Sequence, residues 1–289
     1  MKVSGFTFIR NALKYDYPIV EAIQSILPLC DEVVVCVGNS EDETLQLIQN
    51  IPSPKIRIIQ SIWDDNLRQN GEVLALETNK AFDAISPDSD WAFYIQGDEV
   101  IHEQYYDNIQ KAMLQYKDQP QVEGLLFHYK HFYATYDYIA DSRQWYRREV
   151  RIIRNDKRIR SYKDAQGFRK NNQKLKVKLI DAYVFHYGWV KNPALQKEKE
   201  KNFHRYWHSD EWISQHVKPE DFYDYSNIDS LQIFQGSHPA VMQARIKAKN
   251  WHFEFDTNQK KLSLKNRILQ WIEQRTGIRL FEYRNYKLI

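Results

Sequence analysis

Acidic side chains directly after an apolar run are the first residues in this chain that could do chemistry. The run Trp-Ala-Phe-Tyr-Ile at residues 91–95 leads into Gln96, Gly97, Asp98 and Glu99. Carboxylates at a strand end can hold a divalent cation, and that cation can neutralise the charge of a nucleoside diphosphate. A glycine at position 97 permits a close backbone approach. An ordinary strand-to-loop turn has the same pattern, so both interpretations stay open on the pattern alone.

Two histidines could complete a metal site with Asp98. His186 ends a predicted strand at residues 174–186, and His102 lies close to Asp98 along the chain. A neutral imidazole is a good ligand for a divalent transition metal. A single histidine after a strand is also common as a structural residue, so a metal-binding role for His186 is one of two interpretations.

A strongly basic segment covers residues 143–178. It holds 14 Lys and Arg against 3 Asp and Glu, whereas residues 1–142 hold 10 against 22. Arginines alternate with aromatic residues in it, at Arg143, Trp145, Tyr146, Arg147, Arg148, Arg151 and Arg154. Arginine binds phosphate through two parallel hydrogen bonds, and proteins that bind single-stranded nucleic acid combine the same residue types. The alternative is a solvated face that the acidic first half of the chain neutralises.

The elements that must position these residues alternate between strand and helix over the first 100 residues. Strands are predicted at residues 2–9, 32–37, 55–60 and 91–96, and helices at residues 18–29, 42–50 and 73–85. This alternation indicates βαβ units and a parallel sheet, in which ligands bind at the carboxyl ends of the strands. Arg10 with Asn11, residues 39–42 and residues 96–99 each follow a strand. We therefore expect these three polar clusters at one edge of the sheet.

The pattern changes after residue 120. Longer strands at residues 122–133, 145–153 and 174–186 are expected to extend the sheet in a mixed, partly antiparallel way, and helices are predicted at residues 197–207, 240–249 and 262–273. We expect an α/β fold with a mixed, mostly parallel sheet flanked by helices in residues 1–190, whose acceptor side lies at about residues 120–190. A helical C-terminal extension, residues 191–289, is expected to pack on it.

The segments 3–11, 31–44 and 91–99 together resemble, in this order, the family 2-like GT-A glycosyltransferases, and the resemblance covers about the first 190 residues. It implies a Rossmann-like GT-A fold, a nucleotide-sugar donor and a divalent metal, Mn²⁺ or Mg²⁺. The family's Asp-x-Asp signature reads Gln96-Gly97-Asp98 here, so Asp98 becomes the principal metal ligand and Gln96 can only hydrogen-bond the donor. The residues expected to bind the donor are Arg10, Asn11, Asp42, Asn79, Gln96, Asp98 and Lys191.

Two further roles follow from the resemblance. The run His186-Tyr-Gly-Trp-Val-Lys191 is similar, with shorter spacing, to a His-x-x-Gly-x-x-Lys region in which the histidine binds the metal and the lysine contacts the diphosphate. An inverting enzyme also needs a carboxylate that takes the proton from the acceptor hydroxyl. Asp164 is the first candidate for this base and Glu149 the second. Neighbouring cations would keep Asp164 ionised, although it could also do no more than pair with an arginine.

Composition indicates where the protein works. Hydrophobic residues make up 43% and charged residues 27%, which is typical of a soluble globular protein, and no apolar run approaches the roughly 20 residues that span a bilayer. The N-terminus enters a strand at once, without a signal peptide. Cys30 and Cys36 are expected to be buried thiols in a reducing cytoplasm. The inner face of the membrane is an alternative location, since the basic tail at residues 260–289 could contact anionic lipids or else pack on its own domain.

We therefore predict a hexosyltransferase-type glycosyltransferase. It would move a sugar from a nucleotide-sugar donor to a hydroxyl of a glycan, lipid-linked or polysaccharide-precursor acceptor, with inversion and with the help of a metal. One alternative is a non-enzymatic binder of nucleic acid or anionic polymer through residues 143–178, although nucleic acid is not the expected partner. Another is a nucleotidyltransferase, which would normally have a glycine-rich phosphate loop after the first strand. Residues 10–13, Arg-Asn-Ala-Leu, lack those glycines.

Overall fold

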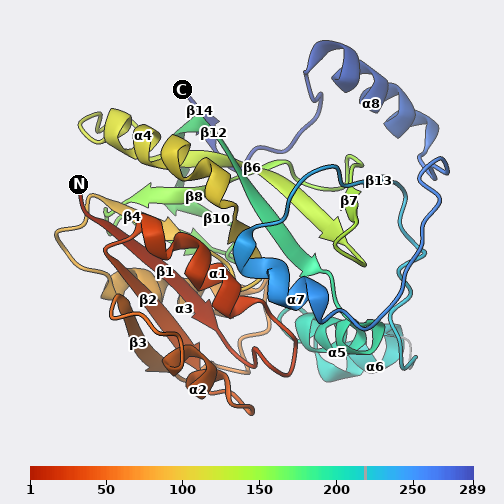
Figure 1. The fold of residues 1–289 in the computed structure, drawn as a ribbon, viewed down its shortest axis with the longest axis horizontal. Helices are drawn as coiled ribbons and strands as arrows, with labels where there is room; N and C mark the ends of the chain where they lie inside the picture. Colours follow the sequence, from red (N-terminus) through yellow and green to blue (C-terminus); the bar gives the residue numbers. More distant parts are fainter. Residues whose placement is uncertain (218–219) are drawn as a thin grey trace.

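The computed structural model describes residues 1–217 and 220–289 and has a large mixed sheet at its centre (Figure 1). The strands of the main path lie in the order β13-β7-β6-β8-β4-β1-β2-β3, and β12 adds β5 and β14. Their bounds are β1 Val3–Ile9, β2 Glu32–Gly38, β3 Ile56–Ser61, β4 Trp91–Tyr94, β5 Glu99–Ile101, β6 Gly124–Tyr133, β7 Tyr138–Ala140, β8 Arg148–Arg154, β12 Lys176–Trp189, β13 Leu231–Ile233 and β14 Lys287–Leu288.

The first half of the sheet is parallel. Strands β3, β2, β1 and β4 pair in parallel, and α1 (Ile19–Ile26), α2 (Thr44–Gln49) and α3 (Glu72–Ala84) connect them. The β-branched run of β2 is buried on both sides, because Val33 and Val35 pack in the core that contains α1 while Val34 packs in the core that contains α3. Two apolar cores therefore enclose this half of the sheet and fix the carboxyl ends of its strands.

The second half of the sheet is mixed. Strand β8 lies antiparallel between β4 and β6, β12 runs parallel to β6, and β5 pairs antiparallel with β12. Strands β9 (Ile159–Tyr162), β10 (Gly167–Lys170) and β11 (Gln173–Lys174) form a small separate sheet, while η1 (Leu27–Leu29), η2 (Glu103–Tyr105) and α4 (Tyr106–Tyr116) complete the element list up to residue 190. The structure thus confirms the predicted α/β class with a mixed, largely parallel sheet flanked by helices.

The C-terminal segment is helical only in part. It contains α5 (Pro193–His204), α6 (Asp210–His216), η3 (Ala240–Met242), α7 (Gln243–Lys247) and α8 (Leu264–Thr276). Long irregular stretches join these helices, and the chain end returns to the sheet, where β14 pairs in parallel with β12. Helix α8 lies at the outer edge of the molecule, away from the other helices (Figure 1).

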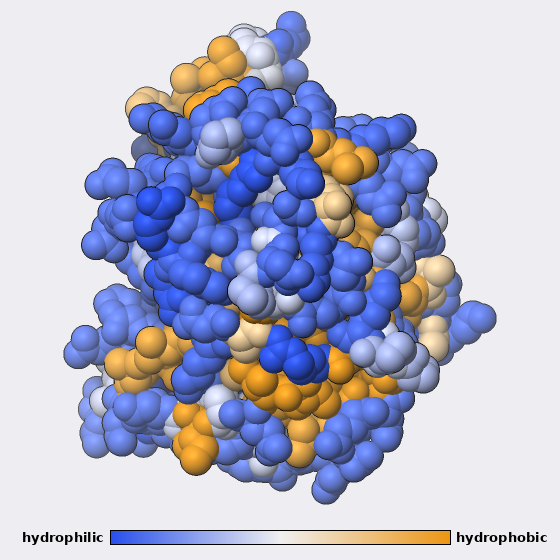
Figure 2. Space-filling view, turned by 90° about the vertical axis from the view of Figure 1, so that its left-hand side faces the viewer, coloured by the Kyte–Doolittle hydropathy of each residue, from blue (hydrophilic) through white to orange (hydrophobic). Residues whose placement is uncertain are grey.

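The face drawn in Figure 2 is mostly hydrophilic, and its largest apolar area lies in the lower half. Cys30 and Cys36 are free and buried, as expected. Within residues 1–217 and 220–289, no helix is both long enough and apolar enough to cross a bilayer.

Candidate functional site

The loop after β4 carries the acidic cluster and is fixed from below by a buried ion pair. Glu99 and Arg151 are both fully buried, and Arg151 Nη2 lies 2.7 Å from Glu99 Oε1. Glu99 also accepts a hydrogen bond of 3.1 Å from the backbone N–H of Gln96. At Gly97 an added Cβ would lie 3.0 Å from Ile9 Cδ1, so glycine allows the loop to pack closely on the end of β1. Glu99 is therefore a structural residue, and Asp98 is the carboxylate that reaches the cavity.

Asp98 lies beside a lysine and a histidine. Lys199 Nζ on α5 is 3.3 Å from Asp98 Oδ2, and His186 Nε2 on β12 is 3.8 Å from Asp98 Oδ1. Burial alone would raise the pKa of the Asp98 carboxyl, but the nearby charges, that of Lys199 first, outweigh this effect and lower the pKa to about 2. Asp98 is thus ionised across the physiological pH range.

A chain of two histidines sets the tautomer of His186. His131 Nε2 lies 2.6 Å from the carbonyl oxygen of Tyr146, which can only accept a hydrogen bond. Burial holds the pKa of His131 well below its usual value, so His131 is neutral, donates from Nε2 and accepts at Nδ1. His186 Nδ1, 3.1 Å from His131 Nδ1, must then be the donor. This leaves the lone pair of His186 Nε2 directed toward Asp98.

The Asp98 and His186 side chains fit a divalent cation. Burial lowers the pKa of His186, so the imidazole is neutral and two acceptor atoms face each other across 3.8 Å. An added Cβ on Gly188 would lie 2.7 Å from Asp98 Oδ2 and 2.8 Å from His186 Nε2, so the glycine keeps the space beside both atoms open. In the described part of the chain no three His, Cys, Asp or Glu side chains gather into a metal-binding group. The protein would therefore supply two ligands and a bound diphosphate or water the others.

These residues open into a large cavity of about 500 Å³. Arg10, Gln96, Asp98 and His186 line it on the side of the sheet, and Asp164 lines it on the side of the turn between β9 and β10. Further lining residues are aromatic, namely Phe8, Tyr15, Tyr17, Trp63, Tyr146, Trp189, Phe203 and Tyr206. Aromatic faces of this kind suit the apolar faces of sugar rings.

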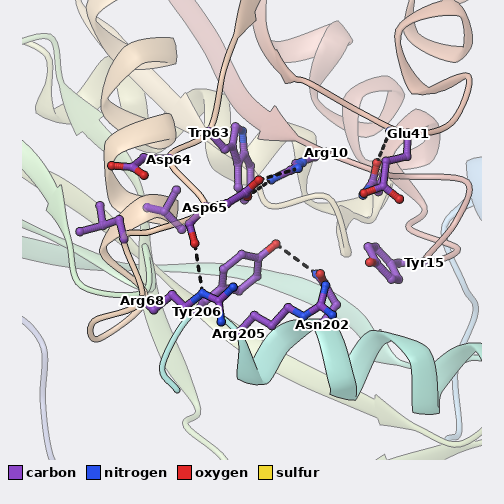
Figure 3. Close-up of a pocket in the computed structure, with 13 residues that line it drawn as sticks. Arg10, Tyr15, Glu41, Trp63, Asp64, Asp65, Arg68, Asn202, Arg205 and Tyr206 are labelled. Carbon is purple, nitrogen blue, oxygen red and sulfur yellow. Dashed lines mark hydrogen bonds and ion pairs between the residues drawn. The ribbon is translucent and has the colours of Figure 1, made fainter. Parts of the chain in front are cut away.

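A smaller cavity of about 140 Å³ adjoins the large one. Arg10, Tyr15, Trp63 and Tyr206 line both cavities. Figure 3 shows the three aromatic rings around the small space, with α5 along its lower side. Arg10 stands at the junction, where its Nη1 lies 2.5 Å from Asp65 Oδ1. The two spaces together form an elongated site with a cation in its middle.

Asp164 is held in an unusual turn. Its two neighbours, Lys163 and Ala165, have φ values of 54° and 60°, in the left-handed region that non-glycine residues seldom adopt. Asp164 packs on Gly71, where an added Cβ would lie 2.9 Å from Asp164 Cβ. Among the residues that the structure describes, no hydrogen bond or ion pair involves the Asp164 carboxylate. The alternative role of Asp164, pairing with an arginine, is therefore absent among the described residues, and the carboxylate is available to a ligand.

Six of the predicted site residues lie together. Arg10 and Asn11 line the small cavity, and Arg10, Gln96, Asp98, Asp164 and His186 line the large one. Two other expected donor contacts lie elsewhere. Asp42 accepts hydrogen bonds from the backbone N–H groups of Lys14 and Thr44. Asn79 is buried and bonds both the N–H and the carbonyl of Ser161. Their side chains therefore hold the backbone in place instead of lining the cavities.

Lys191 and Glu149 also lie outside the cavity lining. Lys191 is fully buried and donates a 2.5 Å hydrogen bond to the carbonyl oxygen of Asp16, while Lys199 is the lysine at Asp98. Glu149 is 3% exposed, and burial raises the pKa of its carboxyl to about 7. His102, the alternative metal ligand, bonds Gln104 N and Ser237 Oγ through its two ring nitrogens.

Helix α5 supplies residues that the sequence analysis did not include. Gln196, Lys199, Glu200, Phe203 and His204 all line the large cavity. Their spacing of three, four, seven and eight positions is that of a single helix face. This face could have been recognised from the sequence, but its mixture of charged and aromatic residues is also typical of a solvent-exposed helix.

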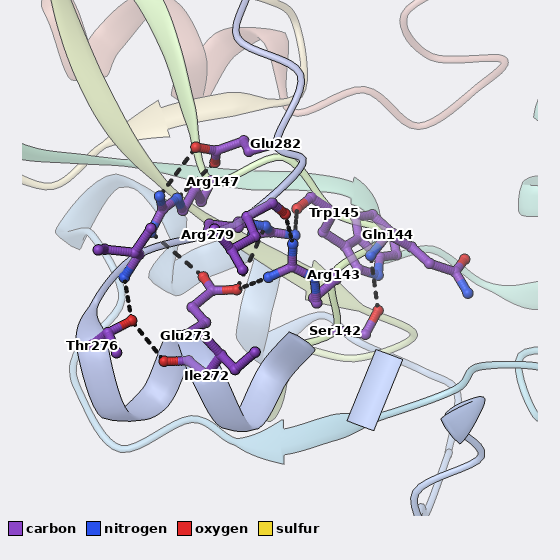
Figure 4. Close-up of polar contacts among 12 residues, drawn as sticks. Ser142, Arg143, Gln144, Trp145, Arg147, Ile272, Glu273, Thr276, Arg279 and Glu282 are labelled. Carbon is purple, nitrogen blue, oxygen red and sulfur yellow. Dashed lines mark hydrogen bonds and ion pairs between the residues drawn. The ribbon is translucent and has the colours of Figure 1, made fainter. Parts of the chain in front are cut away.

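Six of the 14 cations in the basic segment 143–178 form ion pairs with carboxylates of the described residues. Figure 4 shows Arg143 and Arg147 directed toward Glu273 of α8 and toward Glu282, and Arg147 Nε lies 2.7 Å from Glu282 Oε1. Other ion pairs join Arg151 to Glu99, Arg158 to Asp156, Arg160 to Asp83, and Lys170 to Glu123. These pairs use part of the segment's positive charge within the fold, while Lys163, Lys174 and Lys176 are exposed.

Comparisons with known proteins find similarity to solved structures. No protein-family model and no curated protein matches the chain. TarS from S. aureus is 15% identical over 76% of this chain, with a TM-score of 0.38, and the chain spans 41% of the length of TarS. TarS 1-349 in complex with UDP is 16% identical over 76% of this chain and 68% of that one, with a TM-score of 0.37. Glucosyl-3-phosphoglycerate synthase from Mycobacterium tuberculosis, in complex with Mn²⁺, UDP and glucosyl-3-phosphoglycerate, is 19% identical over 46% of this chain and 44% of its own, with a TM-score of 0.30.

Proposed function

We propose that the chain is a glycosyltransferase that moves a hexose from a nucleotide-sugar donor to a hydroxyl group of an acceptor. The observation that carries the proposal is the elongated site itself. It has a small compartment with three aromatic rings at one end, cations and an ionised carboxylate in the middle, and an unpaired carboxylate across the large cavity. A nucleotide sugar fits this order, because its base can stack on the aromatic rings, its diphosphate can bind the cations, and its sugar then lies in the large cavity near the unpaired carboxylate.

The nucleoside occupies the small compartment in this proposal. The rings of Trp63, Tyr15 and Tyr206 offer stacking faces for a base, and Asn11 and Asp64 offer polar groups for the base or ribose. The diphosphate then crosses the junction between the cavities. Arg10 lines both spaces, so its guanidinium can exchange Asp65 for a phosphate oxygen.

Asp98 and His186 are the residues that would hold a divalent ion, Mn²⁺ or Mg²⁺. When bound, such an ion neutralises charge on the diphosphate. Lys199 would also stabilise the diphosphate. Its ammonium lies beside the Asp98 carboxylate, 3.3 Å from Oδ2, and can stabilise the negative charge that develops on the leaving nucleoside diphosphate. Gln96 supplies a neutral amide at the cavity wall for the ribose or the sugar.

Asp164 is the proposed base. It lines the large cavity and has no partner among the described residues, so it can accept the proton of the acceptor hydroxyl as that oxygen attacks the anomeric carbon. A single displacement of this kind inverts the anomeric centre. The acceptor enters between Asp164 and the aromatic wall of Tyr146 and Trp189, which suits a glycan, lipid-linked or polysaccharide-precursor acceptor.

The test combines binding with turnover. Titration calorimetry with nucleoside diphosphates, with and without Mn²⁺, should give one preferred base whose affinity rises when metal is present. Asp98→Asn should remove that metal effect, Asp164→Asn should keep donor binding but lose transfer by about 100-fold or more, and the control Asp83→Asn should change neither. Release of pyrophosphate from a nucleoside triphosphate would instead identify a nucleotidyltransferase. Full transfer by Asp98→Asn and Asp164→Asn would refute the proposed roles.

A further inference from the structure

Helix α8 presents its apolar side chains to solvent. Leu264, Ile268 and Trp271 are 75%, 53% and 58% exposed, and no residue of α8 is buried. Their spacing of four and three positions places them in one stripe along the helix. An amphipathic helix in a globular protein normally turns such a stripe toward the core. In α8 the stripe faces away from the protein.

The side of α8 opposite this stripe contacts the protein and carries Glu273 together with the half-buried Leu269. Glu273 lies about half a turn from the apolar stripe and forms ion pairs with Arg143, Arg147 and Arg279 (Figure 4). The chain segments before and after α8 are also held on the protein. Lys261 N donates to the carbonyl of Asp229 at 2.8 Å before the helix, and β14 joins the sheet after it. The outward direction of the stripe is therefore set by polar contacts on the opposite side.

The surroundings of the stripe are basic. Residues 258–279 contain six Lys and Arg and one acidic residue, Glu273, which points inward. Lys265 and Arg267 are exposed and flank the stripe along the helix. Arg275 continues it, with its guanidinium carbon 5.5 Å from the centre of the Trp271 ring. The outward face thus combines three apolar side chains with cations on each side.

We propose that this face of α8 docks on the surface of an anionic lipid bilayer. In that position Leu264, Ile268 and Trp271 enter the boundary between headgroups and acyl chains, and the flanking cations contact lipid phosphates. Tryptophan suits this boundary because its ring is apolar and its N–H can hydrogen-bond. A second copy of the chain fits the face less well, because a symmetric contact would bring two basic surfaces together. The inference is independent of the reaction proposed above.

The test is flotation of the full chain with lipid vesicles. We expect binding to vesicles of equal parts phosphatidylcholine and phosphatidylglycerol, little binding to phosphatidylcholine alone, and weaker binding at high salt. Ile268→Ser with Trp271→Ser should lower the partition coefficient about tenfold or more. Lys265→Gln with Arg267→Gln should lower it roughly 25-fold, or about fivefold for each cation.

Matched control variants distinguish docking through α8 from nonspecific adsorption to the vesicles. Leu114 on α4 is 59% exposed and Lys111 on the same helix is exposed, so Leu114→Ser and Lys111→Gln should leave binding within about twofold of wild type. Because all substituted side chains are exposed, urea unfolding should give unchanged midpoints. Absence of wild-type binding to the anionic vesicles would overturn the proposal. Vesicle binding by the α8 variants that equals wild-type binding would also overturn it. So would a dimer that sedimentation velocity detects and that requires Trp271, if the protein does not bind vesicles.

Discussion

Replacing Glu99 by glutamine removes the negative charge from an ion pair that lies completely buried beneath the donor loop. The Glu99 carboxylate accepts hydrogen bonds from Arg151 Nε at 2.8 Å, Arg151 Nη2 at 2.7 Å, Tyr129 Oη at 2.7 Å and Gln96 N at 3.1 Å. A glutamine amide has one acceptor oxygen, and its NH₂ group would meet an Arg151 donor. Arg151 would then keep its full charge without a carboxylate partner, with only the glutamine oxygen and the carbonyls of Val150 and Gln166 as acceptors.

The expected cost is large because neither side chain is exposed. Removing one partner of a buried pair typically lowers the free energy of unfolding by about 3–5 kcal/mol, a sizeable part of the roughly 5–15 kcal/mol that stabilises most proteins. Donor affinity should fall as well, since Gln96 and Gln166 both line the large cavity and both bond this pair.

Equilibrium unfolding in urea measures the effect. Glu99→Gln and Arg151→Met should each be strongly destabilising, and the double variant should be more stable than the sum of the two losses predicts, because it leaves no uncompensated charge. A Glu99→Gln protein within about 1 kcal/mol of wild type, or strictly additive losses in the double variant, would refute the assignment of the pair as the support of the loop.

Three other substitutions test further parts of the structure. Burial raises the pKa of Glu149 from 4.5 to about 7, so the free energy of unfolding of the wild type should fall as the pH rises from 4.5 to 7. Over this pH range Glu149→Gln should gain about 3 kcal/mol in stability relative to wild type. Urea titrations at a series of pH values measure this difference, and a difference that does not change with pH would contradict the prediction. Gly188→Ala places a Cβ 2.7 Å from Asp98 Oδ2; calorimetry should show at least about tenfold weaker metal-dependent donor binding with little change in melting temperature, because side-chain ends can move aside. Asn79→Ala leaves two backbone groups of Ser161 unpaired and should cost about 1–3 kcal/mol of stability, with unchanged affinity for the nucleotide-sugar donor. Weaker donor binding by this variant would instead indicate that Asn79 contacts the donor.

The fold was predictable to the extent that local pattern decides it. The buried β-branched run of β2 and the strand–helix alternation of residues 2–96 are visible as periodicity, and they gave the parallel half of the sheet. Less regular parts were missed. The short strands β5, β7 and β9–β11 carry few residues each, and the predicted helical extension contains long irregular stretches because its aromatic and charged residues make specific contacts instead of a repeating pattern.

Part of the candidate site was predictable because its residues directly follow strands of the parallel half. Arg10, Gln96 and Asp98 belong to this group and line the large cavity. The same position after a strand also predicted a donor contact for Asp42, which bonds the backbone instead. Sequence position places a residue at the sheet edge, but neighbouring donors decide whether its side chain is free.

The sequence by itself determined the α/β class, the strand end at Asp98 and the likeness to GT-A enzymes, because these depend on local periodicity and on residues close together in the chain. Tertiary structure decided which of the two candidate histidines meets Asp98, and it added a lysine that the sequence analysis did not include. The antiparallel pairing of β12 with β5 sets His186 opposite Glu99, and α5 brings Lys199 to the Asp98 carboxylate from about a hundred residues away. Such pairings depend on how whole layers pack, and no local pattern encodes their register.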